Sequence, residues 1–389
     1  MSRLPADSGT TFAREALQKF VDSGEIAGAI SVLYDNGIQE TACLGYADAE
    51  TKRPITLDDA FMQCSQTKGF CGVTVAMLIE EGRVGLDDPV SQYLPEFREL
   101  WIETESTNGV RTLVRARNIL RVRHVMNHTG GFPFELPNTK AMGGWSRRMP
   151  LRSVAATAAA MPIQFEPGTR VSYSSIGLDI GAAIVEVVTG LRWEHFLQER
   201  VLDPLDMGDT GFWPTEAHLK GRIGLYEVRA GERARRTPYV DWMAPPYNDN
   251  RVFPSAGAGL WTTARDQLRF YKMLMNLGVG ENGVRILKRE TVLGLLAKST
   301  RASGEVGYSM GLNAPEKDDE DAWFGHGGAW NTSCTVNWHR RQLKLWVVQF
   351  AGEQRWSMCR KERNEAADRF FKSRIDNAGI DAYTGRIGQ

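Results

Sequence analysis

Ser65 and Lys68 are two residues whose types and spacing suggest chemistry. They stand in the segment "CSQTKGF", at the start of a run that predicts a helix. Residues three apart lie on one face of a helix, so the serine hydroxyl and the lysine amine can touch. A serine attacks a carbonyl carbon when a nearby base takes its proton, and a neutral amine is such a base. The spacing therefore makes Ser65 a candidate nucleophile and Lys68 its proton acceptor.

The surroundings of Lys68 favour its neutral form. Gly69 through Ile79 is almost continuously apolar or small, which predicts a helix buried on nearly all sides. Lys68 also lies in the first turn, where the helix dipole disfavours a cation. Burial and the dipole both lower the pKa of a lysine, so its amine can accept a proton near neutral pH. The N–H groups at the helix start have no partner within the helix and can stabilise an oxyanion.

A simpler interpretation of the same segment is structural. Ser65 would cap the helix, and the Lys68 side chain would extend to solvent. A capping box would require Glu or Gln at position 68, so the lysine has the wrong charge for that role. The S-x-x-K pattern is weak by itself, and it leaves both interpretations open.

Two further segments have features of a ligand site. "FEPGTRVSYSSIG" (165–177) places Tyr173 on a short extended piece, between a Pro-Gly turn and a helix that Ser174 can cap. "WFGHGGAWNTSCTVNW" (323–338) places His326 and two glycines just before a predicted strand. Glycines at such a place let a backbone approach a ligand closely.

The elements that must position these residues can be predicted from periodicity. Two runs of β type flank Asp35-Asn36-Gly37 and predict a hairpin near the N-terminus. Residues 332–352 predict a second hairpin, with "HRRQ" as its turn. The segments between the two hairpins have helical periodicity or are rich in alanine. Helices are predicted for 151–161, 174–190, 193–202, 262–278 and 358–375, and 103–118 is expected to be a polar excursion.

Strands at both termini and helices between them indicate an α+β fold. We expect one antiparallel sheet, built from both ends of the chain and flanked by helices, with an all-helical lobe inserted between its halves. The expected division is 1–60 plus 255–389 for the sheet domain and 61–254 for the mainly helical domain. The active site is expected in the cleft between them. Four aromatic residues of two loops are expected to line that cleft: Trp145, Tyr239, Trp242 and Tyr247.

The composition argues against several classes of protein. The 389 residues include 47 basic and 47 acidic side chains, so no overall positive field favours nucleic acid or an anionic membrane. No stretch of about 18 apolar residues predicts a membrane helix, and the first residues lack the apolar run of a signal peptide. The five scattered cysteines argue against a disulfide framework or a zinc site. We expect a cytoplasmic protein whose partner is a small-molecule substrate.

Taken together, the segments with Ser65, Tyr173 and His326 resemble the serine β-lactamase and penicillin-recognising superfamily, in particular its class C β-lactamase-like branch. That branch includes DD-peptidases, D-amino-acid amidases and the family VIII carboxylesterases. Further stretches in the family's order support the resemblance: "EEGRVGLDDPVSQYLPEF", "RHVMNHTGGF" and "AGAGLWTTARDQLRF". The resemblance implies an antiparallel sheet flanked by helices beside an all-helical lobe, in agreement with the periodicity.

The resemblance also implies a role for each site residue. Ser65 would be the acylated nucleophile and Lys68 its proton acceptor. Tyr173 would relay protons to the leaving group and from the deacylating water, and whether the lysine or the tyrosine acts as the base is left open. The N–H groups of Ser65 and Ala329 would form the oxyanion hole. Such a mechanism needs no cofactor and no metal.

Two positions depart from the family pattern, and both bear on the substrate. The usual Y-x-N ends in Ser175 here, so a hydroxyl replaces an amide that helps penicillin-recognising relatives to hold their substrate. The usual K-T-G begins with His326, which replaces a permanent cation by a group only partly charged at neutral pH. Both departures count against an efficient β-lactamase. The expected substrate-binding residues are Ser175, His326, Gly327 and Gly328.

Other constellations carry less weight. Glu166 in F-E-P-G is interpreted as a turn residue rather than a deacylation base. His124 and His128 are spaced i, i+4 and would share a helix face, but a third metal ligand is missing. The chain has no G-x-S-x-G elbow, which argues against an α/β-hydrolase.

The sequence thus predicts a serine hydrolase that works through an acyl-enzyme, in the first place a carboxylesterase acting on small or medium acyl esters. The alternative activity is that of a D-amino-acid amidase or peptidase, or of a DD-carboxypeptidase, with weak β-lactam hydrolysis as a side reaction. An alternative of another class is a catalytically inactive binding protein on the same scaffold. The joint presence of Ser65, Lys68 and Tyr173 favours the enzyme.

Overall fold

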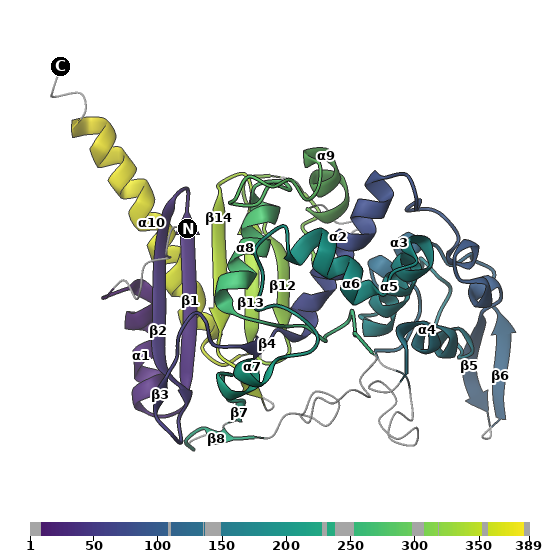
Figure 1. Cartoon of the computed structure of the whole chain (residues 1–389), viewed down its shortest axis with the longest axis horizontal. Coiled ribbons are helices and arrows are strands. Elements are labelled where there is room, and N and C mark those ends of the chain that lie inside the picture. Colours follow the sequence, from purple (N-terminus) through teal and green to yellow (C-terminus); the bar gives the residue numbers. More distant parts are fainter. Residues whose placement is uncertain are drawn as a thin grey trace.

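The structure is a computed structural model. It describes residues 9–107, 110–134, 136, 149–227, 232–237, 253–297, 307–317, 319–351 and 357–384. Figure 1 shows a sheet with helices on both of its faces and a group of helices beside it.

An eight-stranded antiparallel sheet combines the two ends of the chain (Figure 1). The strand order is β10-β11-β12-β13-β14-β1-β2-β3, so β1 lies between β14 and β2. Ile30 of β1 lies opposite Val347 of β14 and Cys43 of β2. The strands are β1 (Gly28–Asp35), β2 (Ile38–Asp48), β3 (Arg53–Pro54), β10 (Tyr308–Ser309), β11 (Leu312–Asn313), β12 (Phe324–Gly328), β13 (Thr332–Asn337) and β14 (Gln342–Val347).

Both predicted hairpins are present in this sheet. β1 and β2 are joined at Asn36 and Gly37, whose positive φ angles of 42° and 102° suit a tight turn between twisted strands. β13 and β14 are joined by residues 338–341. The expected α+β class, with an antiparallel sheet flanked by helices, is confirmed.

Helices cover both faces of the sheet. On β1, Ile30 and Val32 belong to the main buried cluster, whereas Ala29 and Leu33 belong to a second cluster on the opposite face. Because side chains alternate along a strand, a strand buried on both faces is apolar along most of its length. The second cluster lies under α1 (Phe12–Asp22) and α10 (Arg360–Thr384), and α8 (Ala264–Met275) packs on the main-cluster side of β13 and β14.

The helix that follows Ser65 is α2 (Thr67–Glu80), and it has no polar face. Every residue from Thr67 to Leu78 is buried. The helix contacts α5 (Ser175–Thr189) and α6 (Trp193–Leu197) of the helical group as well as β11 of the sheet. The prediction of a helix buried on nearly all sides is confirmed, and Lys68 therefore starts inside the protein.

α5 (Ser175–Thr189) is the centre of the helical group, because α2, α3, α4 and α6 all contact it. Its ends follow ordinary capping rules. The Ser174 hydroxyl accepts a hydrogen bond from the Gly177 N–H at 3.3 Å, and Gly190 ends the helix with a φ of 74°. The other helices of the group are α3 (Val122–Met126), α4 (Leu151–Ala159) and α6 (Trp193–Leu197).

The segment expected to be a polar excursion is instead a hairpin of β5 (Trp101–Thr107) and β6 (Val110–Arg115) at the edge of the molecule (Figure 1). All residues of β6 are exposed, so neither face of this strand is covered, although Ile102 of β5 is buried in the main cluster. A strand without a buried face has no need of apolar alternation, which is why periodicity missed it.

Several short elements complete the described fold. β4 pairs with β9, which joins the start of the predicted helical segment to the part of the chain that follows it. The boundaries predicted at residues 61 and 255 stay a prediction. The short elements are β4 (Phe61–Met62), β9 (Trp261–Thr262), β7 (Tyr226–Glu227), β8 (Arg235–Arg236), β15 (Phe350–Ala351), α7 (Glu216–Lys220) and α9 (Arg289–Thr291).

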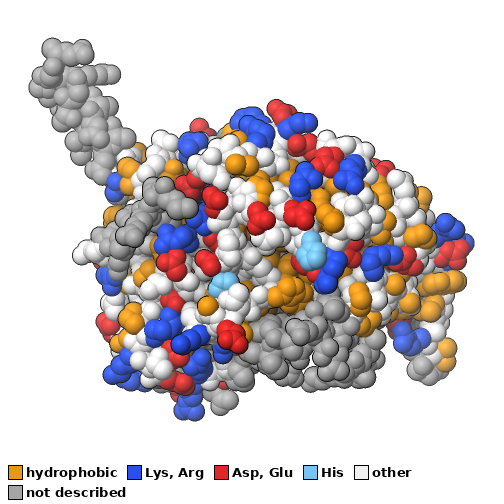
Figure 2. Space-filling model, viewed as in Figure 1, with side chains coloured by type: hydrophobic (Ala, Val, Ile, Leu, Met, Phe, Trp, Pro, Cys, Tyr) orange, Lys and Arg blue, Asp and Glu red, His pale blue; other side chains and the backbone are white. Residues whose placement is uncertain are grey.

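The surface carries both charges in close mixture. Figure 2 shows Lys and Arg side chains interspersed with Asp and Glu over the face in view. This mixture agrees with the balance of 47 basic and 47 acidic residues. Among the described residues, no helix has the length and hydropathy needed to cross a bilayer.

Candidate active site

Ser65 lies in a 3-10 turn (Cys64–Gln66) that leads directly into α2. Cys64 starts this turn with a positive φ of 51°, and the Thr67 hydroxyl donates to the Cys64 carbonyl at 2.7 Å. The serine is partly exposed, while the residues on both sides of it are buried. Its hydroxyl is thus held at the start of the helix and accessible from one side.

The Lys68 amine lies next to the Ser65 hydroxyl. Lys68 is fully buried, and its Nζ is 3.1 Å from Ser65 Oγ, 3.2 Å from Ser175 Oγ and 2.6 Å from the Gly257 carbonyl oxygen. The structural interpretation, in which this side chain extends to solvent, is wrong. The i, i+3 spacing brings the two groups together as predicted, although Ser65 belongs to the turn and not to the helix itself.

Burial lowers the pKa of Lys68 to about 7, and the nearby Asp179 carboxyl partly opposes this shift. At neutral pH a large fraction of the amine is therefore uncharged. A neutral amine has two N–H groups and one lone pair. Ser175 Oγ and the Gly257 carbonyl can accept the two N–H groups, which leaves the lone pair for the Ser65 proton.

Tyr173 lies across from the lysine, and its hydroxyl is 3.3 Å from His326 Nε2. Lys68 Nζ sits 4.7 Å from the centre of the tyrosine ring. Burial raises the pKa of Tyr173 far above neutrality, and a hydrogen bond with the Ser65 hydroxyl offsets part of this shift. The tyrosine is therefore a protonated phenol that can donate a proton, in contact with both the nucleophile and His326.

His326 on β12 is uncharged, because burial and the Lys68 charge lower its pKa to about 3. Its Nδ1 donates to the Gly327 carbonyl at 2.5 Å, so Nε2 is left as an acceptor for the Tyr173 hydroxyl. The sequence predicted a partly charged group here. The structure differs. His326 is only 5% exposed and lies near Lys68, so neither solvent nor an opposite charge stabilises a protonated imidazole there.

The two glycines after His326 bring β12 against the nucleophile turn. A Cβ at Gly328 would lie 2.4 Å from the Gln63 carbonyl oxygen, so only glycine fits this approach. The main-chain amides of Ala329 and Trp330 lie close to the Cys64 thiol, where they lower its pKa, although burial raises it more strongly, to about 12. The predicted oxyanion donor Ala329 therefore stands beside the turn that carries Ser65. Gly327 is partly exposed on the same strand.

Two residues of this site were not assigned to it from the sequence. Asp179 on α5 is 2% exposed and accepts from the main-chain amides of Ala256 and Gly257. His128 is 1% exposed, accepts from the Ser174 amide at 3.2 Å and packs against the Tyr173 ring. A lone carboxyl in the apolar run of α5 was the available signal for Asp179.

Two residues that were set aside have structural roles. The Glu166 carboxylate accepts from the amides of Arg117 and Asn118, each at 3.0 Å, which fits the predicted turn residue. His124 Nδ1 accepts from the Arg121 amide at 3.2 Å. The expectation that His124 and His128 share a helix face is wrong, because α3 ends at Met126 and His128 has a φ of 64°.

The four aromatic residues expected to line the cleft, Trp145, Tyr239, Trp242 and Tyr247, lie outside the described residues.

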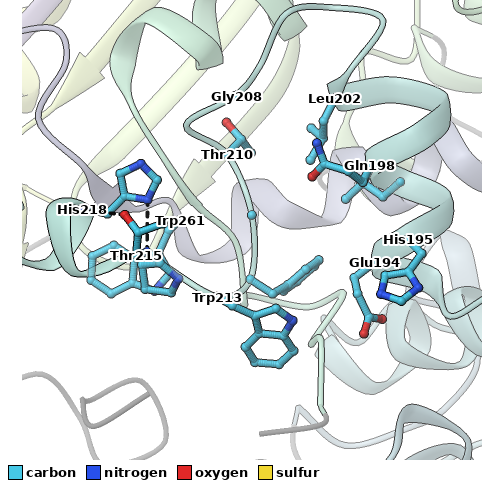
Figure 3. A pocket seen from close by; sticks show the side chains of 14 residues that line it. Glu194, His195, Gln198, Leu202, Gly208, Thr210, Trp213, Thr215, His218 and Trp261 are labelled. Atoms are coloured by element: carbon cyan, nitrogen blue, oxygen red, sulfur yellow. Dashed lines mark hydrogen bonds between the residues drawn. The ribbon is translucent and has the colours of Figure 1, made fainter. Parts of the chain in front are cut away.

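A separate pocket of about 240 Å³ lies between α6 and the segment 208–218 (Figure 3). Its described lining does not include Ser65, Lys68 or Tyr173. Trp261 connects the two regions, since it lines the pocket and also packs in the buried cluster that contains Cys64. The remaining lining is formed by Glu194, His195, Leu197, Gln198, Leu202, Gly208, Thr210, Gly211, Phe212, Trp213, Pro214, Thr215 and His218.

Comparisons of the whole chain with known proteins show its family. The sequence model of the Beta-lactamase family matches residues 13–369. The chain belongs to the Beta-lactamase family. The expected resemblance to the serine β-lactamase and penicillin-recognising superfamily is thereby confirmed, and so is the class of serine hydrolase.

Individual relatives and structures agree with this assignment. Protein Rv1367c of Mycobacterium tuberculosis is 28% identical over 83% of this chain and 78% of its own length. The esterase EstB of Burkholderia gladioli is 29% identical over 63% of this chain and 64% of its own length. The solved structure of EstCE1, a hydrolase with promiscuous acyltransferase activity, is 22% identical, has a TM-score of 0.75 and covers 92% of this chain and 97% of its own. The likeness to EstCE1 shows the fold.

Proposed function

We propose that this member of the Beta-lactamase family is a carboxylesterase that forms an acyl-enzyme on Ser65, with small or medium acyl esters as substrates. The observation that carries the proposal is the fully buried Lys68 amine, whose Nζ lies 3.1 Å from Ser65 Oγ. Its lowered pKa of about 7 makes the amine a base at neutral pH. The similarity to EstB, an esterase, supports the ester as substrate.

In the proposed acylation step, Ser65 Oγ attacks the ester carbonyl while Lys68 takes the hydroxyl proton. The N–H groups of Ser65 and Ala329 stabilise the negative carbonyl oxygen of the tetrahedral intermediate. As the ester C–O bond breaks, the Tyr173 hydroxyl protonates the departing alkoxide, and the Lys68 ammonium returns a proton to the tyrosine. The acyl-enzyme is left with a neutral lysine and a protonated tyrosine.

In the proposed deacylation step, a water molecule attacks the acyl carbonyl and gives its proton to Lys68. The bond to Ser65 then breaks, and the Lys68 ammonium protonates the serine oxygen. This assigns the base to the lysine in both steps, because the pKa of Tyr173 is raised by burial and the pKa of Lys68 is lowered. The tyrosine acts as the acid.

The departures from the family pattern favour a neutral ester over a substrate with a carboxylate. His326 is uncharged, and its Nε2 accepts from Tyr173, so it supplies no cation for a substrate carboxylate. The Ser175 hydroxyl accepts from Lys68 and takes the place of the amide that would hold a substrate side chain. The site therefore lacks the cation and the side-chain amide with which an amidase or a DD-carboxypeptidase would hold its substrate, and this counts against both alternatives.

A substrate panel tests the proposal. p-Nitrophenyl esters of increasing acyl length, D-amino-acid amides and a chromogenic cephalosporin are assayed on the wild type and on Ser65→Ala. We expect turnover of the short and medium esters that Ser65→Ala loses. A matched control is Ser373→Ala on α10, which removes a hydroxyl that donates to the Phe370 carbonyl and accepts from Arg374 Nε within the same helix, far from Ser65 in the sequence.

The same panel distinguishes the alternatives. Faster turnover of the D-amino-acid amides than of every ester would favour the amidase. Absence of both turnover and a covalent adduct of Ser65 with a fluorophosphonate probe would favour the inactive binding protein. Wild-type activity in Ser65→Ala would contradict the assignment of the nucleophile.

A further inference from the structure

Asp179 is a buried carboxyl group in an otherwise apolar part of α5. It is 2% exposed, between buried neighbours on both sides along the helix. Its Oδ1 accepts from the main-chain N–H of Ala256 at 2.8 Å and of Gly257 at 3.3 Å. The Ser255 hydroxyl also approaches this oxygen, at 3.4 Å. One carboxyl oxygen therefore fixes the turn 255–257 through consecutive amides.

The same turn holds the Lys68 amine. The Gly257 carbonyl accepts from Lys68 Nζ at 2.6 Å, which is shorter than the contacts of the amine with Ser65 and Ser175. The turn has no room to move toward α5, because a Cβ at Gly257 would lie 2.4 Å from the Ser175 Cβ. Gly257 thus links the carboxyl of Asp179 on one side to the amine of Lys68 on the other.

Asp179 is also the group near Lys68 that can carry a negative charge near neutral pH. Burial raises its pKa to about 7, and the Lys68 charge opposes that shift. The other titratable groups that act on Lys68 or respond to its charge stay neutral, because burial raises the pKa of the thiols and of the phenol and lowers the pKa of the imidazoles. These neutral groups are Cys64, Cys71, Tyr173, His128 and His326.

We propose that Asp179 is a positioning residue for Lys68: it orients the amine toward Ser65 through the Gly257 carbonyl, and its carboxylate is the counter-charge of the ammonium that forms during acylation. This inference rests on the proposed function, because it assumes that Lys68 accepts the Ser65 proton. A buried ammonium is unstable without an opposite charge nearby. Asp179 supplies that charge from α5, and Gly257 lies between its carboxylate and the Lys68 amine.

Asp179→Asn separates the charge from the geometry. The asparagine amide oxygen can still accept from the Ala256 and Gly257 amides, while the negative charge is lost. The matched control is Asp266→Asn on α8, which also removes a buried carboxylate that accepts from a main-chain amide, that of Asp209 at 2.9 Å. Asp266 is not among the groups whose charge acts on Lys68.

The first readout is the rate at which a fluorophosphonate phosphonylates Ser65, measured against pH. We expect Asp179→Asn to lower the plateau rate about tenfold and to move the acid limb to lower pH by on the order of one unit, because the lysine loses the charge that raises its pKa. Asp266→Asn is expected to keep the wild-type limb. A folded Asp179→Asn variant with the wild-type limb and plateau would overturn the inference, and a lower rate without movement of the limb would reduce Asp179 to a structural role.

A second measurement needs neither activity nor a stable Asp179→Asn protein. The carboxyl carbon of Asp179 is titrated by NMR in the wild type and in Lys68→Met. We expect its midpoint to move to higher pH in Lys68→Met, since the lysine charge lowers the pKa of this carboxyl. An unmoved midpoint would overturn the coupling. Failure of the esterase proposal is a separate outcome. In that case the wild-type protein turns over no ester, while the Asp179 midpoint still differs between the wild type and Lys68→Met.

Discussion

Lys68 owes its reactivity to the cost of burying a charge. The same burial acts on His326, so at pH 7 the histidine is neutral and accepts from the Tyr173 hydroxyl, while a large fraction of the lysine is neutral and can take the Ser65 proton. The two neutral bases differ in what they can do, because the pKa of the lysine stays near 7 while the pKa of the histidine falls to about 3. Only the lysine can take up a proton at physiological pH.

The first prediction at this scale concerns the pH profile. For a neutral ester, kcat/KM should rise with pH through about 7, as the Lys68 ammonium loses its proton, and then level off. His326→Gln keeps an acceptor for the Tyr173 hydroxyl and should keep this limb. Steady-state kinetics between pH 5 and pH 9 check the expectation. A limb that disappears in His326→Gln would mean that the histidine, not the lysine, titrates.

The second prediction at the residue scale concerns the acid. Tyr173→Phe keeps the ring that packs against His128 and removes the hydroxyl, so we expect an intact fold and a kcat lower by about 10² to 10⁴. Tyr93→Phe is the control, because it removes a hydroxyl that donates to Asp88 elsewhere in the chain. Turnover by Tyr173→Phe at the wild-type rate would remove the tyrosine from the mechanism. Circular dichroism confirms that both variants are folded.

At the scale of elements, the position of α2 depends on close backbone contacts with the β10–β11 turn. A Cβ at Gly72 would lie 1.9 Å from the Met310 carbonyl oxygen, and one at Gly311 would lie 2.6 Å from the Lys68 carbonyl oxygen. Gly311 also has a φ of 74°, which other residues rarely adopt. The sheet and the helix therefore touch directly at the residue that carries the amine.

The prediction that belongs to this contact is the effect of Gly72→Ala. The added methyl group must push α2 away from the turn, so we expect a loss of about 1–3 kcal/mol in the free energy of unfolding and a lower kcat, because Lys68 moves with its helix. Gly294→Ala is the matched control, since a Cβ at Gly294 meets nothing within 4 Å. Urea unfolding and ester kinetics measure both effects. Equal stability of the two variants would contradict the close approach.

For the whole molecule, the buried lysine links stability to pH. Its pKa is about 7 in the folded protein and 10.5 ordinarily, so between these values the unfolded chain binds the extra proton. Stability must therefore rise with pH in that window, by at most about 1.4 kcal/mol per pH unit. Asp179, with its raised pKa of about 7, acts in the opposite sense at lower pH.

The prediction is that Lys68→Met has a flatter or falling stability curve above neutrality. Urea unfolding of the wild type and the variant is compared from pH 7 to about 8, below the ordinary cysteine pKa of about 8.5. The difference in unfolding free energy between wild type and variant should grow in favour of the wild type as the pH rises. Parallel curves would show that the lysine is not neutral in the folded protein.

Prediction from the sequence succeeded where the signal was local. Ser65 and Lys68 are three residues apart, and each predicted hairpin is a continuous stretch, so periodicity and spacing describe them. It failed where a contact spans the chain or where burial decides. Asp179 meets Gly257 across 78 positions, and the neutral state of His326 follows from a burial that the residue type does not reveal.

The placement of β1 affects how the chain folds during its synthesis on the ribosome. β1 is complete at Asp35, but its partner β14 begins at Gln342. One edge of β1 therefore stays without its partner strand while more than 300 residues are synthesised. During that time Ile30 and Val32 have no cover from the strand that will neighbour them. β12, which carries His326 of the active site, also leaves the ribosome late. A nascent chain therefore holds the nucleophile segment long before it can react, and chaperones that shield an unpaired strand edge should bind it in the interval.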